Sequence, residues 1–163
     1  QALPFRSLID TDDPSFYNPG DMPAAIAASC KAAGEPPPAT PGEFARCIFE
    51  SLALKYRHVL DSLRQISGRK IDRIHIIGGG SKNRFLCQLT ANATGLKVIA
   101  GPAESTAIGN LLIQAMGLGY VESLQAIRDI VRNSFETEVF LPEGTEKWDR
   151  VYERYLKIVT SDE

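Results

Sequence analysis

The most regular pattern of apolar and polar positions runs from Ala45 to Ile66, where apolar residues recur at intervals of three or four. The stripe consists of Ala45, Ile48, Leu52, Tyr56, Val59, Leu63 and Ile66. This spacing places them on one face, so we expect a core helix that ends near Ser67-Gly68. Thr40-Pro41-Gly42-Glu43 fits a capping box at its start, because the Thr40 hydroxyl can satisfy a first-turn amide while Glu43 reaches back.

A shorter helix is predicted before this one. Asn18-Pro19-Gly20-Asp21 is typical of a helix start, with Asn18 as the N-cap and Pro19 in the first helical position. We expect this helix to run to about Ala33 and to stop at Gly34. Residues 1–18 are rich in Asp, Pro and Ser, with scattered apolar residues, and predict an ordered but irregular segment.

The pattern changes from helical to extended at residues 71–77. The run Ile74-His75-Ile76-Ile77 is short, β-branched and almost continuously apolar, which suits a strand buried on both faces, as in a parallel sheet. We therefore expect His75 to be a satisfied core histidine. Gly78-Gly79-Gly80-Ser81 ends this strand, a helix is expected from near Lys82 to Gly95, and residues 97–100 predict a second strand.

The remaining chain alternates helices and short extended stretches. Helices are expected from about Ser105 to Leu118, from a Ser123 cap to about Val131, and from Thr145, the last with Trp148, Tyr152 and Tyr155 inward. Strand, helix, strand, helix indicates an α/β fold with a short parallel sheet flanked by helices. Two convincing strands are few for such a sheet. Further strands lie hidden in residues 1–17 and 136–141, or part of the sheet lies outside this chain, and we favour the second.

Composition narrows the class of protein. The chain has 163 residues, a formal net charge of −2, 44% hydrophobic and 23% charged residues, which is typical of a globular protein and argues against a nucleic-acid partner. No apolar stretch is long enough for a transmembrane helix, and no leader precedes the first helix, so we expect no membrane partner. Cys30, Cys47 and Cys87 form no CxxC motif, which favours small buried side chains and a reducing, cytoplasmic location. Because Gln1 opens the chain without Met, we expect the natural protein to begin earlier.

The glycines after the first strand are the strongest candidate site. Gly78, Gly79 and Gly80 let the backbone pass close to a ligand, and the following helix directs its free amides at the same turn, which suits phosphate. Asn83 is placed one turn into the helix mouth, where its amide could meet a base or a ribose. The segment is neither a GxGxxG fingerprint nor a Walker A loop. A tight turn without any ligand therefore stays an open alternative.

Several segments, in order and spacing, resemble the FGGY family of sugar kinases. These are Ile74 to Asn83, Lys97 to Pro102, Glu104 to Asn110 and Ala45 to Leu54. The resemblance covers nearly the whole chain and is weakest after about Val131. It implies an actin-like, ribonuclease-H-like domain, which would be the second, ATP-binding domain of a two-domain kinase that uses ATP and Mg²⁺. Residues 1–163 would be the C-terminal portion of that domain, with the N-terminal sugar-binding domain absent.

The resemblance also implies roles for individual residues. Gly79 and Gly80 would approach the nucleotide phosphates through their backbone, Asn83 would face the adenosine, and Gly78 would shape the turn. The catalytic base of the family is an Asp near the domain junction, which no residue here matches, so we expect no catalytic residue and no metal ligand in this chain. Glu104 is expected to have a structural role rather than one at the magnesium ion.

The function expected from the resemblance is transfer of the ATP γ-phosphate to a sugar, with L-rhamnulose and L-rhamnulose 1-phosphate the expected substrate and product. The isolated chain is expected to be inactive. The uncovered edge of the first strand invites pairing with another copy, so we expect self-association. Two alternatives stay open: a non-catalytic, actin-like regulatory module that binds ATP, and an assembly domain in which the glycine turn stays empty.

Overall fold

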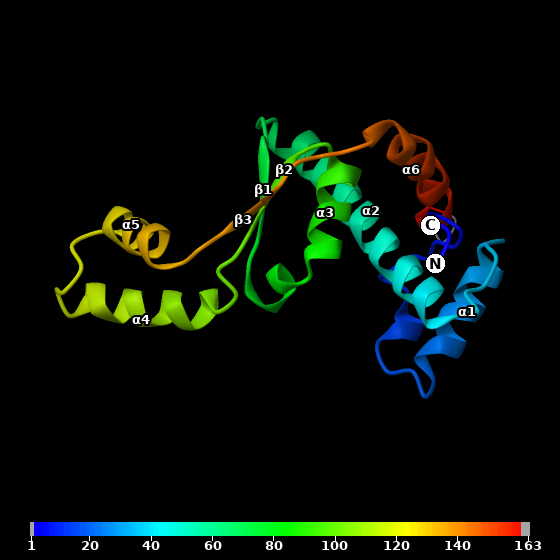
Figure 1. The fold of residues 1–163 in the computed structure, drawn as a ribbon, viewed down its shortest axis with the longest axis horizontal. Helices are drawn as coiled ribbons and strands as arrows, with labels where there is room; N and C mark the ends of the chain where they lie inside the picture. Colours follow the sequence, from blue (N-terminus) through cyan, green and yellow to red (C-terminus); the bar gives the residue numbers. More distant parts are fainter. Residues whose placement is uncertain (1, 161–163) are drawn as a thin grey trace.

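A computed structural model describes residues 2–160, which form six α-helices around one three-stranded sheet (Figure 1). The helices are α1 (Met22–Ala32), α2 (Pro41–Ser67), α3 (Arg84–Thr94), α4 (Ser105–Gly117), α5 (Leu124–Ser134) and α6 (Thr145–Val159). The strands are β1 (Arg73–Ile76), β2 (Lys97–Ala100) and β3 (Glu138–Phe140), and two 3₁₀ helices are η1 (Pro14–Phe16) and η2 (Gly78–Lys82). The predicted α/β class is confirmed.

The sheet is mixed rather than purely parallel. β1 and β2 run parallel, with Ile74 opposite Val98, and α3 connects them as the sequence predicted. β3 lies antiparallel to β2, with Val139 opposite Ile99. The chain returns to the sheet from α4 and α5 at the carboxyl end of β2, which fixes this direction (Figure 1). The strand order is β1-β2-β3, so the outer edge of β1 has no partner within residues 2–160.

Local capping signals place the ends of α2. The Thr40 hydroxyl accepts a hydrogen bond from the Glu43 amide at 3.3 Å, as a capping box requires. The Glu43 carboxylate reaches one residue further back than predicted, because it accepts from the Ala39 amide at 2.8 Å. At the other end, Gly68 adopts a left-handed conformation, φ 61°, which ends the helix as predicted.

The start of α1 was predicted incorrectly. The helix begins at Met22 and not at Pro19, and its N-cap is Asp21 rather than Asn18. The Asp21 carboxylate accepts a hydrogen bond from the Ala24 amide at 3.0 Å. Asp21 takes the N-cap position because its side chain satisfies a first-turn amide, a role that was predicted only for Asn18.

The buried face of α2 is also offset from the predicted stripe. Its buried residues are Cys47, Glu50, Ser51, Ala53, Leu54 and Leu60. The second half of the predicted stripe is not core, because Tyr56, Val59, Leu63 and Ile66 are 39–85% exposed. Two polar side chains, Glu50 and Ser51, lie on the buried face because backbone amides of the N-terminal segment donate hydrogen bonds to them. The Phe5 amide donates to Glu50 at 2.7 Å, and the Ile9 amide donates to the Ser51 hydroxyl at 3.1 Å.

Three apolar clusters hold the helices and the sheet together. The first lies between α2, α3 and α6 and contains Leu54, Trp148 and Tyr155, which confirms the inward aromatic stripe of the last helix. The second joins α3 to one face of the sheet through Cys87, Val98 and Phe140, among others. The third seats α1 on α2, and in it the Cys30 and Cys47 sulfurs lie 4.0 Å apart. All three cysteines are buried free thiols, as predicted.

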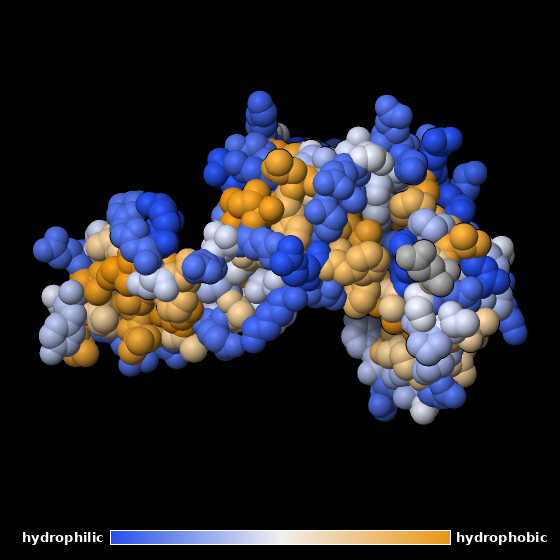
Figure 2. Space-filling model, in the orientation of Figure 1, coloured by the Kyte–Doolittle hydropathy of each residue, from blue (hydrophilic) through white to orange (hydrophobic). Residues whose placement is uncertain are grey.

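The other face of the sheet is bare in the described residues. His75 and Val139 are exposed there, in register with Ile99, and Ile77 is also exposed. The predictions that this strand is buried on both faces and that His75 is a core histidine are therefore wrong for these residues. The reason is that α4 and α5 extend away from the sheet (Figure 1) and have no buried residue. Figure 2 shows apolar surface gathered over these two helices.

Candidate functional site

The glycine turn is fixed against the connection between β2 and α4. Gly78 adopts φ 72°, a conformation that favours glycine, and its amide donates to the Pro102 carbonyl at 3.1 Å. The Ser81 hydroxyl donates to the Gly78 carbonyl at 2.7 Å. The turn therefore has a defined shape at the carboxyl ends of two parallel strands, which is where open α/β sheets bind their ligands.

Gly79 and Gly80 have no structural need to be glycine within the described chain. Neither adopts a positive φ. A Cβ built on Gly79 would meet nothing within 4 Å, and one on Gly80 would make an ordinary contact of 3.7 Å with Ile76. Both residues are exposed. Since neither packing nor conformation excludes a side chain, the open backbone here is suited to close approach by a group from outside these residues.

Asn83 is the N-cap of α3 and does not lie one turn inside the helix. Its Oδ1 accepts a hydrogen bond from the Leu86 amide at 3.0 Å, which orients the side chain and leaves the Nδ2 group available to donate. The helix starts at Arg84 rather than near Lys82 because the glycines form their own 3₁₀ turn, η2. The N-terminus of α3 still follows directly on the glycine turn, so its free first-turn amides remain the groups expected to face a ligand there.

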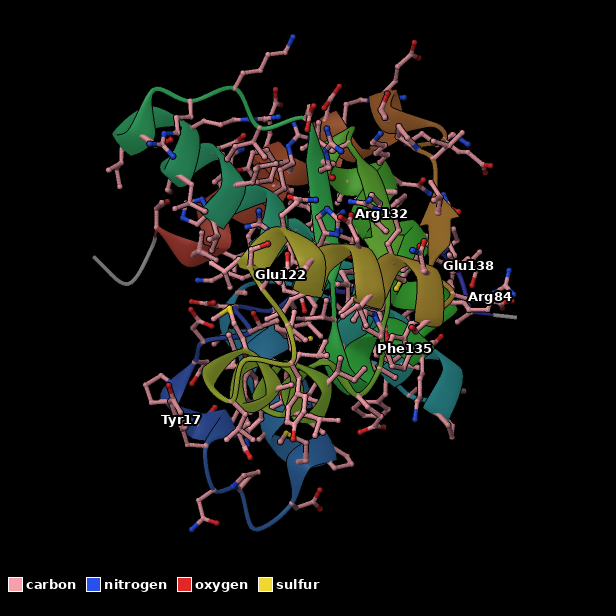
Figure 3. The ribbon with its side chains drawn as sticks, turned by 90° about the vertical axis from the view of Figure 1, so that its left-hand side faces the viewer. Tyr17, Arg84, Glu122, Arg132, Phe135 and Glu138 are labelled. Carbon is pink, nitrogen blue, oxygen red and sulfur yellow. The ribbon has the colours of Figure 1, made fainter. Side chains whose placement is uncertain are left out.

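Charged side chains form a rim around the turn. Lys82 lies 3.7 Å from the Glu104 carboxylate at the start of α4. Arg84 lies 2.6 Å from Glu138 on β3, and its guanidinium is 6.0 Å from the centre of the Phe140 ring. Figure 3 shows Arg84 and Glu138 side by side at the edge of the molecule. These pairs tie the turn to the segment that follows β2, and α3 to β3.

A depression of about 440 Å³ adjoins the turn. Its lining includes Ser81 from the turn, Gly101 and Ala103 from the connection after β2, and Glu136 and Thr137 before β3. Gly101 is required here, because its φ is 108° and a Cβ would lie 3.2 Å from the Glu136 carbonyl oxygen. The depression is open to solvent and lies beside the turn, where part of a ligand held at the turn would extend.

The four residues expected to bind nucleotide therefore lie together. Gly78, Gly79 and Gly80 make the turn, and Asn83 caps the helix that follows it. No sequence pattern indicates the Arg84–Glu138 pair, because the antiparallel placement of β3 brings these residues together from distant segments. Within residues 2–160, no three His, Cys, Asp or Glu side chains are grouped as a metal site requires. None of the helices in that range has the length and apolar composition needed to cross a bilayer.

Comparison with known proteins identifies relatives over most of the chain. Residues 1–118 match the family described as FGGY family of carbohydrate kinases, C-terminal domain. The rhamnulokinase of Bacteroides thetaiotaomicron is 47% identical over 156 residues, which are 96% of this chain and 32% of that protein. The rhamnulokinase of Enterococcus faecalis is 44% identical over 83% of this chain and 28% of that protein. The chain thus spans about a third of the length of these relatives.

Solved structures share the fold. The crystal structure of xylulose kinase from Rhodospirillum rubrum matches with a TM-score of 0.58 and 25% identity, over 76% of this chain and 25% of that one. The gluconate kinase from Lactobacillus acidophilus matches with a TM-score of 0.57 and 19% identity, over 76% of this chain and 26% of that one. The actin-like α/β architecture expected from the sequence is confirmed. By its sequence and by the fold around its glycine turn, the chain belongs to the FGGY family of carbohydrate kinases and matches their C-terminal domain.

Proposed function

We propose that this chain is the C-terminal portion of the ATP-binding domain of a sugar kinase, with Gly78, Gly79, Gly80 and Asn83 at the nucleotide. The observation that carries this proposal is the open backbone at Gly79, where a side chain would meet nothing within 4 Å. At the carboxyl end of a strand, a glycine that the fold itself does not require leaves its backbone open to close approach by a ligand. The proposed ligand is the phosphate chain of ATP.

Each residue has a defined task in this proposal. The Gly79 and Gly80 amides donate to phosphate oxygens, and the positive end of α3 adds a favourable field for the anion. Asn83 has its Oδ1 engaged by the Leu86 amide, so its Nδ2 group is the one that donates to the adenosine. Together these groups position the nucleotide and stabilise charge on the departing phosphates, which is the larger part of catalysis in phosphoryl transfer.

The proton transfer lies outside this chain in the proposal. An Asp of the remaining protein removes the proton from a sugar hydroxyl, whose oxygen attacks the γ-phosphorus in line while the bond to the β-phosphate oxygen breaks and ADP leaves. Mg²⁺ would neutralise phosphate charge when bound. The described residues contain no group of carboxylates fit to hold it, so no step here passes through the ion.

L-Rhamnulose is the sugar we propose, with L-rhamnulose 1-phosphate as the product. Support comes from the rhamnulokinases of three organisms, which are 44–47% identical to this chain over most of its length. The xylulose kinase structure reaches 25% identity. The sugar is bound mainly by the N-terminal domain in this proposal, and a cytoplasmic location accords with the three free thiols.

The test is ATP-dependent phosphorylation by the complete polypeptide that contains this chain, across L-rhamnulose, D-xylulose, D-gluconate and glycerol. We expect turnover of L-rhamnulose, and a raised KM for ATP in Gly79→Val and Asn83→Ala. ATP binding without turnover of any sugar would instead favour a regulatory ATP-binding module. Absence of ATP binding would favour an assembly domain whose turn stays empty.

A further inference from the structure

One ion pair joins the glycine turn to the start of α4. Lys82 is the last residue of η2, and Glu104 is the residue just before α4. The Gly78 amide, bonded to the Pro102 carbonyl, holds these two segments together, so the ammonium and the carboxylate face each other 3.7 Å apart. The pair therefore connects the segment that follows β1 to the segment that follows β2.

This pair is looser than nine other ion pairs among the described residues, which measure 2.5–3.2 Å. Both side chains of the Lys82–Glu104 pair are well exposed, at 71% and 76%. An exposed pair at this separation contributes little to stability, because water screens both charges. The pair therefore stabilises the fold only slightly, and little stability is lost when Lys82 moves away from Glu104.

Glu104 has no second task that would compete for its carboxylate. It occupies the N-cap position of α4 but makes no side-chain capping bond. The carboxylate lies beside the positive end of α4, which favours its negative charge whether or not the lysine pairs with it. Lys82 can thus be released at small cost.

Lys82 is also the cation best placed to move. Arg84 is held at 2.6 Å by Glu138 and lies near the Phe140 ring. Arg73 and Lys97 lie at the first residues of β1 and β2, at the opposite end of the sheet from the turn. A lysine has a compact charge on a flexible stem, which suits exchange between two anions.

We infer that Lys82 is a phosphate-binding residue that Glu104 holds beside the turn when no nucleotide is bound and releases to the nucleotide. This inference rests on the function proposed above, because it assumes that the glycine turn receives a triphosphate. The several negative charges of ATP attract the ammonium more strongly than one exposed carboxylate does. Glu104 is in this sense a positioning residue that keeps the cation near its target.

The test compares three variants of the complete polypeptide: Lys82→Met, Glu104→Gln and the double variant. ATP affinity is measured by isothermal titration calorimetry, and KM for ATP and kcat by a coupled assay. We expect Lys82→Met to weaken ATP binding by roughly three- to tenfold with little change in kcat. We expect Glu104→Gln to tighten binding by about twofold, and the double variant to match Lys82→Met, because Glu104 acts through Lys82.

Lys97→Met is the matched control, since it removes the same charge from an exposed residue at the far end of β2, and its ATP affinity should equal that of the wild type. All variants should unfold at the wild-type temperature, because both side chains of the pair are exposed. Equal ATP affinity in the wild type and Lys82→Met, with loss of binding in Gly79→Val, would overturn this inference and leave the proposed function standing. No ATP binding by the wild type would overturn both.

Discussion

Substitutions at two neighbouring glycines of the turn should affect ligand binding and the stability of the fold separately. Gly79 and Gly78 are neighbours, but only Gly78 has a positive φ, 72°. A Cβ on Gly79 meets nothing within 4 Å, and one on Gly78 meets only the Ala103 carbonyl oxygen at 4.0 Å. Gly79→Ala should therefore leave the fold intact and obstruct the proposed phosphate contact. Gly78→Ala should strain the backbone.

The expected changes in the free energy of unfolding follow from the backbone conformation of the two glycines. Gly79→Ala reduces the freedom of the unfolded chain without strain in the folded one, so the free energy of unfolding should be unchanged or rise by up to about 1 kcal/mol. Gly78→Ala places a Cβ in the left-handed region and should cost about 1–2 kcal/mol. A methyl group at Gly79 that holds the phosphates away from the backbone amides should weaken ATP binding by at least tenfold, or about 1.4 kcal/mol.

Urea unfolding and ATP titration on the same preparations provide the measurement. Gly109→Ala is the control for Gly79→Ala, because Gly109 lies inside α4 and its Cβ also meets nothing within 4 Å. Gly95→Ala is the control for Gly78→Ala, since Gly95 adopts φ 68° at the end of α3. Neither control should alter ATP affinity. Wild-type ATP affinity in Gly79→Ala would refute the argument that its open backbone is the phosphate site.

Three further results are expected. Leu54→Ala should lower the free energy of unfolding by about 2–5 kcal/mol in urea titrations, because Leu54 is fully buried. Ile66→Ala should lower it by less than about 0.5 kcal/mol, because Ile66 is 85% exposed. Similar losses in the two variants would mean that both faces of α2 are core. Burial raises the pKa of Glu50, so its contribution to stability is present at low pH and is lost as pH rises through the raised pKa. The fall in urea midpoint from about pH 4 to about pH 8 should thus be smaller in Glu50→Gln, and equal falls would contradict this reasoning. The chain should self-associate with rising concentration in light scattering, less so in Ile77→Lys beside the open edge of β1, and a monomer at all concentrations would count against edge pairing.

Most signals that act over a few residues were predicted correctly, the starts of α1 and α3 excepted. Thr40 and Ser123 cap their helices, and Gly68 and Gly95 end theirs in the left-handed conformation. The glycine turn, the helix after it and the parallel pair β1–β2 were likewise visible in the sequence. These features depend on hydrogen bonds between near neighbours and on the steric limits of single residues, which are fully present in the local sequence.

Features that depend on distant segments needed the tertiary structure. The periodicity of α2 predicted Ile66 as a core residue. The N-terminal segment, α3 and α6 pack on a different face of this helix, so Glu50 is buried and Ile66 is exposed. The strand pattern placed His75 in a core, although no helix in the described residues covers that face. A strand within residues 136–141 was the alternative that we did not favour, and the structure has it as β3. Its antiparallel pairing with β2 and the Arg84–Glu138 pair depend on the return of the chain from α5. A hydrophobic pattern determines which faces can be buried, and only the packing of distant elements determines which of them are.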